Sequence, residues 1–301
     1  MRSWITVLVA ATCGLSIAAC ANSGACYDRT RMLPDERQIL TAITHGQAGR
    51  DLAAAVFAGD QAVVRQMLTS DPQLRTAHVP PATYPDFAPD GQFGDLLTFA
   101  VAQCDTGMVD LLLQLGVPAD GAIPGSPLTL AVQARDLTIA RQLLAAGAHP
   151  DQPPGDPFRT MYSATLKSPE AVELLLAHGA DPDRRDSTGT SILQTAVDGD
   201  AMRSAEVLIR HGGDPWLLGP DGVLPVQGIA EPLILSTEAD EAARQRLLRQ
   251  VGRADRPWPP PSPRDVRRAV AEDRWPISDT PAALVADIKA HAAQDRANPS
   301  G

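Results

Sequence analysis

Residues 127–152 read PLTLAVQARDLTIARQLLAAGAHPDQ, and the pattern of this stretch returns along much of the chain. It consists of an apolar start, a small residue, a short turn, a segment with paired leucines and then glycine. Apolar residues at helical spacing in both halves predict two helices joined by a turn. Further copies occupy residues 51–73, 95–121, 160–184, 191–216 and, in weaker form, 232–256. The pattern predicts an all-α solenoid of about six helix–turn–helix units with flanking capping helices.

Each copy places a small residue in its first helix, where a larger side chain would keep the two helices of a unit apart. Aligning these residues gives a period of about 33, broken by two longer connections. The aligned residues are Ala55, Ala100, Ala131, Ser163, Ala196 and Ser236.

Cap residues mark both ends of the second helix. Glycine follows it in three copies, where a left-handed backbone is free of strain only for glycine; these are Gly147, Gly179 and Gly212. Side chains of the N-cap type precede it at Asp60, Asp105, Asp136 and Ser168. A row of acids could also suggest a cation site, but helix capping accounts for it.

The endings and starts of these copies resemble the ankyrin repeat. Residues 175–182 read Leu-Leu-Ala-His-Gly-Ala-Asp-Pro, and residues 126–129, Ser-Pro-Leu-Thr, keep part of the family's Thr-Pro-Leu-His start. The resemblance covers about residues 50–255, which we take as the repeat region. It implies a surface of first helices and finger loops that binds other macromolecules, although the fold alone does not name the ligand.

The finger loops of the fourth and fifth copies supply candidate partner-binding residues. Their mixed charges favour a protein over a polyanion, and arginine and tryptophan are common interface anchors. The candidates are Asp181, Asp183, Arg184, Arg185, Asp186, Asp214 and Trp216. The alternative is a solvated finger with the tryptophan packed beneath it.

Two connections exceed the period, at about residues 72–94 and 216–231. The first contains Tyr84 and Phe87, in a chain whose aromatic content is only 4%. Long loops in compact repeats are often functional, so these two residues are further candidates for partner binding. The alternative is that they fold back over the edge of the solenoid.

The amino terminus reads as an export signal. An apolar run follows Arg2 and ends in Ile17-Ala-Ala-Cys20, which resembles a bacterial lipobox. We expect residues 1–19 to be a signal peptide, Cys20 to be lipidated and residues 20–33 to form a tether. Ala21 favours the outer membrane, with the repeats facing the periplasm of the bacterial envelope. A plain signal peptide cut after Ala19 and an uncleaved anchor remain alternatives.

The repeat region has two flanks. Residues 34–49 are expected to form a capping helix, since terminal units of such arrays need a cover. Residues 256–301 begin with a proline-rich stretch and continue with helices. These helices either cap the sixth unit or form a mobile tail.

Cysteine use fits an oxidising compartment. Once the signal leaves and Cys20 is lipidated, Cys26 and Cys104 are the remaining thiols. Two such cysteines in the periplasm favour a disulfide bond. Two unpaired thiols, with Cys104 half-buried, are the alternative.

The sequence contains no GxSxG, HExxH, P-loop or CxxC motif, and we expect neither catalysis nor a metal or cofactor. His178 and His211 hold equivalent places before a capping glycine, where charged histidine suits the helix end better than it suits a metal site. A net charge of −10 argues against nucleic acid as a partner.

The sequence thus predicts a monomeric, lipid-anchored protein that binds an unidentified protein partner. Two narrower roles follow from resemblance to exported ankyrin proteins: immunity against a secreted antibacterial effector, and periplasmic peroxide-stress protection alongside a catalase. The contrasting hypothesis is a hydrolase or metal-binding protein that uses unrecognised residues.

Overall fold

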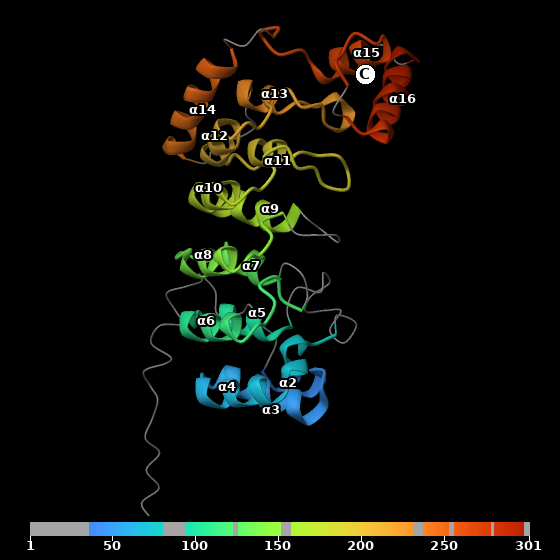
Figure 1. The fold of residues 1–301 in the computed structure, drawn as a ribbon. Coiled ribbons are helices and arrows are strands. Elements are labelled where there is room, and N and C mark those ends of the chain that lie inside the picture. Colours follow the sequence, from blue (N-terminus) through green and yellow to red (C-terminus); the bar gives the residue numbers. More distant parts are fainter. Residues whose placement is uncertain are drawn as a thin grey trace, which may run out of the picture.

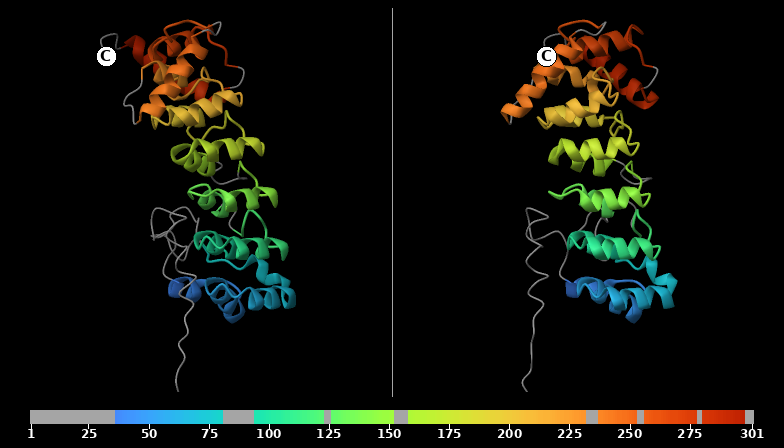
Figure 2. Two further views of the ribbon diagram at one scale, coloured as in Figure 1. Left: turned by 90° about the vertical axis from the view of Figure 1, so that its left-hand side faces the viewer. Right: turned by 60° about the vertical axis from the view of Figure 1, so that its left-hand side comes forward.

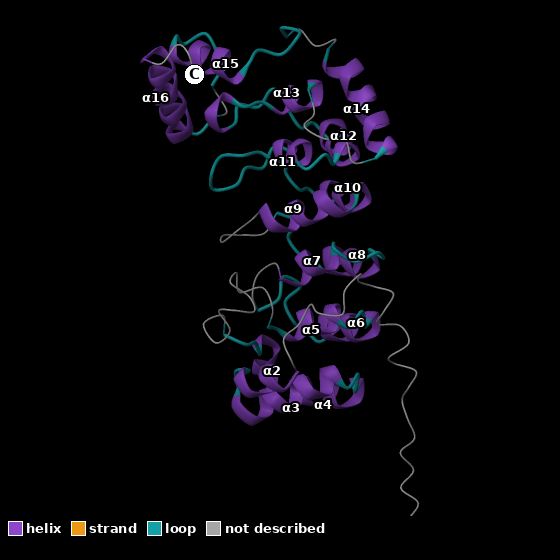
Figure 3. Cartoon of the chain, turned by 180° about the vertical axis from the view of Figure 1, so that it is seen from behind, coloured by secondary structure: helices purple, strands orange, loops and turns teal. Residues whose placement is uncertain are grey.

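The computed structural model describes residues 36–80, 94–122, 126–151, 158–231, 237–252, 256–277 and 280–297. These residues form fifteen α-helices and two short 3-10 helices. They contain no β-strand, only isolated bridges between His78 and Asp95 and between Arg185 and Ser191. Figure 1 shows helix pairs stacked in series, and the view from behind in Figure 3 shows the same ladder. The fold is an ankyrin-repeat solenoid.

Six helix pairs make up the units of the array. Unit one pairs α3 (Gly46–Phe57) with α4 (Gln61–Ser70), unit two α5 (Leu96–Ala102) with α6 (Thr106–Gln114), and unit three α7 (Ser126–Ala131) with α8 (Thr138–Ala145). Unit four pairs α9 (Phe158–Lys167) with α10 (Pro169–Ala177), unit five α11 (Ile192–Asp198) with α12 (Met202–Arg210), and unit six α13 (Pro225–Ala230) with α14 (Glu238–Val251). The first helices of successive units contact one another along one layer, which we call the inner layer. The second helices form the outer layer beside it, as Figures 1 and 3 show, and the turned views of Figure 2 show the units following one another in a single column.

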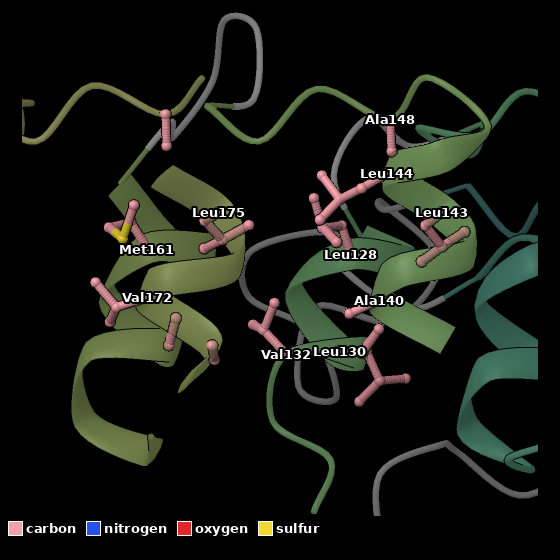
Figure 4. Packing of buried hydrophobic residues seen from close by; sticks show 14 of the residues in the cluster. Leu128, Leu130, Val132, Ala140, Leu143, Leu144, Ala148, Met161, Val172 and Leu175 are labelled. Atoms are coloured by element: carbon pink, nitrogen blue, oxygen red, sulfur yellow. The ribbon is translucent and has the colours of Figure 1, made fainter. Parts of the chain in front are cut away.

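The core is aliphatic and continuous between units. Leu128 and Leu143 of unit three are fully buried, as are Val172 and Leu175 of unit four. Figure 4 shows Leu128 and Leu175 on the sides of the two units that face each other. Burying each such side chain contributes about 1.5–3 kcal/mol, so neighbouring units depend on one another for stability.

Three of the four predicted N-caps and the predicted glycine caps are present. The side chains of Asp60, Asp105 and Ser168 accept hydrogen bonds from the backbone N–H three residues later, at 3.0, 2.9 and 3.0 Å. Unit three differs from the prediction, because the N-cap of α8 is Leu137, which has no capping side chain; Asp136, one residue earlier, accepts from the N–H of Thr138 at 3.0 Å. The glycines after the second helices have φ of 94°, 92° and 100°, as expected for a left-handed cap, at Gly147, Gly179 and Gly212.

The amino-terminal boundary differs from the prediction. The structure divides the expected capping helix 34–49 into α2 (Glu36–Ala42) and the first turn of α3. His45 and Gly46, with φ of 65° and 61°, separate the two helices. Residues 46–49 therefore belong to unit one, and α2 packs against α3 as the cover of the array.

The sixth unit begins earlier than the sequence pattern placed it. Its first helix is α13, not a segment starting at Pro232, and residues 232–236 lie outside the described residues, Ser236 among them. Buried Ile229 takes the place of the small residue and follows Ala196 by 33 positions. The alignment missed it because no small side chain stands there. The extra residues of this unit thus lie between α13 and α14, not before α13.

A one-residue shift also corrects unit four. Ala164 is fully buried whereas Ser163 is only half-buried, so Ala164 is the residue equivalent to Ala131 and Ala196. The turn before α10 is one residue shorter than in the other units, which concealed this register in the sequence.

Two C-terminal helices, α15 (Pro263–Ala271) and α16 (Ala282–Ala297), pack against each other and against the 3-10 helix η3 (Pro220–Gly222). The other 3-10 helix, η1 (Pro72–Thr76), follows α4. Among the described helices, none has the length and apolar character of a membrane span.

Candidate functional site

An exposed apolar pair lies on the inner helix of unit four. Tyr162 and Leu166 are 43% and 44% exposed and are four residues apart on α9, so they share one face of the helix. The other large hydrophobic side chains exposed among the described residues are isolated from this pair in sequence: Val63, Trp258 and Ile277. Contiguous exposed apolar surface of this kind marks interaction sites.

Equivalent positions in neighbouring units define the surroundings of the pair. The residue two places after each aligned core residue is Gln133 in unit three, Leu166 in unit four, Asp198 in unit five and Glu231 in unit six. We call this row, from Gln133 to Glu231, the inner stripe. Gln133 is half-buried, and the other three side chains are exposed. The inner stripe changes from apolar to acidic between units four and six.

Leu166 reaches toward unit five. A Cβ added to Gly199 would lie 2.8 Å from Leu166 Cδ2, so the glycine leaves room for the leucine side chain. Behind it, the buried Ser204 hydroxyl donates to the carbonyl oxygen of Thr165 at 2.8 Å and ties α9 to α12. The apolar pair thus rests on a fixed backbone.

Asp198 follows in unit five. Gln194 Nε2 donates to Asp198 Oδ1 at 2.7 Å. Although the residue is exposed, neighbouring atoms partly desolvate its carboxyl, and this raises the pKa of Asp198 above the ordinary value of 3.8; the charge of Asp200 acts in the same direction. A cation placed beside this carboxylate would restore the stabilisation that water no longer provides.

The acidic finger residues have a structural role that the sequence did not reveal. Oδ1 of Asp183 accepts from the backbone N–H of Asp214 at 2.8 Å, and Oδ2 of Asp151 accepts from that of Asp181 at 2.7 Å. In each case a carboxylate of one unit holds the backbone of the next. Burial raises the pKa of Asp151 and of Asp183.

The remaining acids and Arg185 stabilise their own loops. Asp181, Asp186 and Asp214 each accept from the backbone N–H two residues later, at 2.9, 2.8 and 2.8 Å. Arg185 Nη1 donates to the carbonyl oxygen of Gly189 at 2.6 Å, and burial lowers its pKa. Side chains committed to the loop in this way contribute less to an external partner.

Trp216 is only 5% exposed. Its ring lies beneath Arg256, whose Cζ is 5.9 Å from the ring centroid. Trp216 is therefore not a surface anchor: as in the alternative given from the sequence, it is packed, here between unit five and Arg256 of the C-terminal segment. Arg184 is half-buried, and its backbone N–H donates to Asp181 O at 3.3 Å.

The C-terminal helices cover the fingers of the last units. Arg267 Nη1 donates to the carbonyl oxygen of Asp221 at 2.8 Å, and His291 Nδ1 lies 2.6 Å from Asp221 Oδ1. In the finger loop between units four and five, a Cβ on Gly189 would lie 3.1 Å from Leu284 of α16. Figure 1 shows α15 and α16 beside the finger ends of the upper units. Tyr162, Leu166 and Asp198 on α9 and α11 remain exposed beside this covered region.

The two equivalent histidines point to different partners. His178 Nδ1 lies 2.9 Å from the carbonyl oxygen of Leu174, and His211 Nε2 lies 2.8 Å from Glu173 Oε1. The bond from His211 lowers the pKa of Glu173. Within the described residues, no group of three or more His, Cys, Asp or Glu side chains has an arrangement suited to a metal ion.

Several predicted residues lie outside the described part of the chain: Cys20, Cys26, Tyr84 and Phe87. Cys104 is disulfide-bonded, and its partner also lies outside the described residues. Its pairing with Cys26 stays a prediction.

Tyr162 and Leu166 are not among the binding residues predicted from the sequence. A comparison of equivalent positions could have identified Leu166. Two places after the buried core alanine, units three and five carry the polar residues Gln133 and Asp198, whereas unit four carries leucine. The misplaced register of unit four hid that comparison.

Comparison with known proteins agrees with the fold. The chain is 38% identical over 117 residues to a Treponema pallidum (strain Nichols) protein described as "Putative ankyrin repeat-containing protein". The match covers 36% of this chain and 37% of that relative, so it spans little more than a third of either protein. No protein-family model matches the chain.

Proposed function

We propose that this chain is a non-catalytic protein-interaction module, anchored by a lipid in the bacterial envelope, with the array facing the periplasm. The observation that carries the binding function is the exposed pair Tyr162 and Leu166 on the inner layer of a stacked array. Stacked repeats form extended surfaces suited to macromolecular partners, and exposed apolar side chains on them favour a protein. The ankyrin-repeat relative supports the same class of function.

The proposed location rests on the sequence of residues 1–20, which the structure does not describe. The lipobox pattern before Cys20 supports attachment of a diacylglycerol to this thiol. Ala21 supports sorting to the outer membrane.

Partner capture from solubilised envelopes tests the binding function. Wild type should capture a stoichiometric partner protein, and the double variant Tyr162→Ser/Leu166→Ser should lose at least about tenfold in capture, because truncated anchors dominate interface energy. Val63→Ser is the matched control, since Val63 is also exposed, at 38%, but lies on the outer helix α4. Absence of any partner for wild type would contradict the proposal.

The identity of the captured protein separates the narrower roles. A secreted effector encoded next to this gene would support immunity, and a catalase would support protection against peroxide. Fractionation tests the location: Cys20→Ala should leave the membrane pellet, whereas Cys13→Ala should remain in it. Retention of Cys20→Ala in the membrane would contradict lipid anchoring.

A further inference from the structure

The inner stripe carries a chemical gradient that describes a partner. Leu166 in unit four is followed by Asp198 in unit five and Glu231 in unit six, all exposed and all in equivalent places in their units. Successive units are stacked through contacts of α9 with α11 and of α11 with α13. An apolar site is therefore followed by acidic residues at the equivalent places of the next two units.

The apolar end is built to receive a side chain. Tyr162 lies one helical turn before Leu166, and both are more than two-fifths exposed. Gly199 allows Leu166 to lie against the end of α11 instead of pointing into solvent. A large apolar side chain placed on this pair would bury part of both residues, at about 25 cal/mol per Å² of apolar surface.

The arginines of the neighbouring outer helices contact other groups. Arg203 Nε lies 3.4 Å from Asp240 Oδ1. Arg244 Nε lies 2.7 Å from Glu241 Oε2, and its Nη1 also donates to the carbonyl oxygens of Ile229 and Ala230, at 3.2 and 3.4 Å, next to Glu231. Asp198 is therefore the better placed of the two acids to attract a cation. The partial desolvation of Asp198 adds to the attraction that a cation would feel there.

Resting on the proposed function, we infer that units four to six bind a short basic–apolar segment of a partner protein. A large apolar side chain of this segment packs on Tyr162 and Leu166. Lysine or arginine side chains that follow it pair with Asp198 and Glu231. The net charge of −10 on the whole chain favours the approach of such a segment.

Selection from a random 12-residue peptide library on the immobilised full chain tests this inference. The selected peptides should combine Phe, Trp, Leu or Ile with Lys or Arg one to four residues away. Synthetic copies should bind Leu166→Ser about tenfold more weakly than wild type. Asp198→Asn/Glu231→Gln should weaken binding several-fold and flatten its salt dependence.

Two controls separate this site from general effects. Val63→Ser removes an equally exposed apolar side chain from α4, and Asp287→Asn removes an exposed carboxylate from α16. Both should bind the peptides as wild type does. Thermal unfolding of each variant should also match wild type, since all substituted side chains are exposed.

The inference is wrong if the selected peptides are acidic or lack basic residues, or if they bind Leu166→Ser as well as wild type. If wild type still captures a protein from the envelope, those outcomes contradict the basic–apolar segment but not the proposed protein-binding function. If wild type neither selects peptides nor captures an envelope protein, both the inference and the proposed function fail.

Discussion

Oδ1 of Asp183 accepts a hydrogen bond from the backbone N–H of Asp214, 31 residues later, at 2.8 Å. The bond joins the end of unit four to the end of unit five. Asp151 and Asp120 make the same bond one and two units earlier, at 2.7 and 2.8 Å. A row of carboxylates thus sets the spacing of the finger loops and satisfies backbone donors that adjoining units would otherwise leave unpaired.

Replacing Asp183 with alanine should lower the free energy of unfolding by about 1–3 kcal/mol, because it leaves the N–H of Asp214 without its acceptor. Urea denaturation followed by circular dichroism measures the loss. Asp287→Ala, which removes an exposed carboxylate with no such role, should change stability by less than about 0.5 kcal/mol. Equal effects of the two substitutions would show that the cross-unit bond is energetically unimportant.

The Asp183 carboxylate should also make the free energy of unfolding depend on pH, in a direction that its pKa shift determines. Burial raises the pKa of Asp183 in the folded state above its ordinary value of 3.8. Between the pKa of the unfolded state and the higher pKa of the folded state, the folded state therefore binds more protons than the unfolded state. Its contribution to stability therefore decreases as pH rises through that window. Asp183→Asn removes this titration, so the stability of the variant relative to wild type should increase from about pH 4 to about pH 7.

Glu206 is a control for the pH experiment because its pKa shifts in the opposite direction to that of Asp183. The hydrogen bond from Arg246 lowers its pKa below 4.5. The stabilisation from this pair is present above that value and is lost as pH falls toward the folded-state pKa. Glu206→Gln should therefore become less stable relative to wild type as pH rises, by up to about 1 kcal/mol for a pair this exposed. Parallel trends in Asp183→Asn and Glu206→Gln would contradict both assignments.

Local features of the fold could be predicted from the sequence. The caps at Asp60 and Ser168 and the left-handed Gly147 depend on neighbours a few residues away, so their residue types are sufficient evidence. The role of the finger acids could not be predicted in the same way. The partner of Asp183 is a backbone N–H in the next unit, and every non-proline residue carries such a donor.

A second limit of prediction from the sequence concerns which apolar side chains are exposed and which are buried. Trp216 is buried by packing and by Arg256, which lies 40 residues later in the sequence, so its local sequence left both burial and exposure open. Tyr162 and Leu166 have the residue types of a core, and only the register of α9 places them outward. One residue of shift in the turn before α10 was enough to conceal that register.

The junction of units five and six should be sensitive to a single added methyl group. A Cβ on Gly228 would lie 2.3 Å from Val197 Cγ1, so Gly228→Ala forces α11 and α13 apart. We expect a loss of about 1–3 kcal/mol in urea denaturation. Adding Val197→Ala should recover part of this loss, with a coupling of about 1 kcal/mol. Gly107→Ala is the control, because its Cβ would meet the movable end of Gln61 at 2.9 Å and Asp105 Oδ1 only at an ordinary contact distance of 3.5 Å.

The disulfide of Cys104 should stabilise the array by about 2–4 kcal/mol. Reduction of wild type and the substitution Cys104→Ser should each lower the free energy of unfolding by this amount. Reductant should have no further effect on Cys104→Ser. If Cys26 is the partner, Cys26→Ser releases the Cys104 thiol, and alkylation without reductant adds one label to the mass of the chain. Cys13→Ser should leave Cys104 unlabelled, because the signal peptide that contains Cys13 is removed. An unreactive Cys104 in Cys26→Ser would show that another thiol forms the bond.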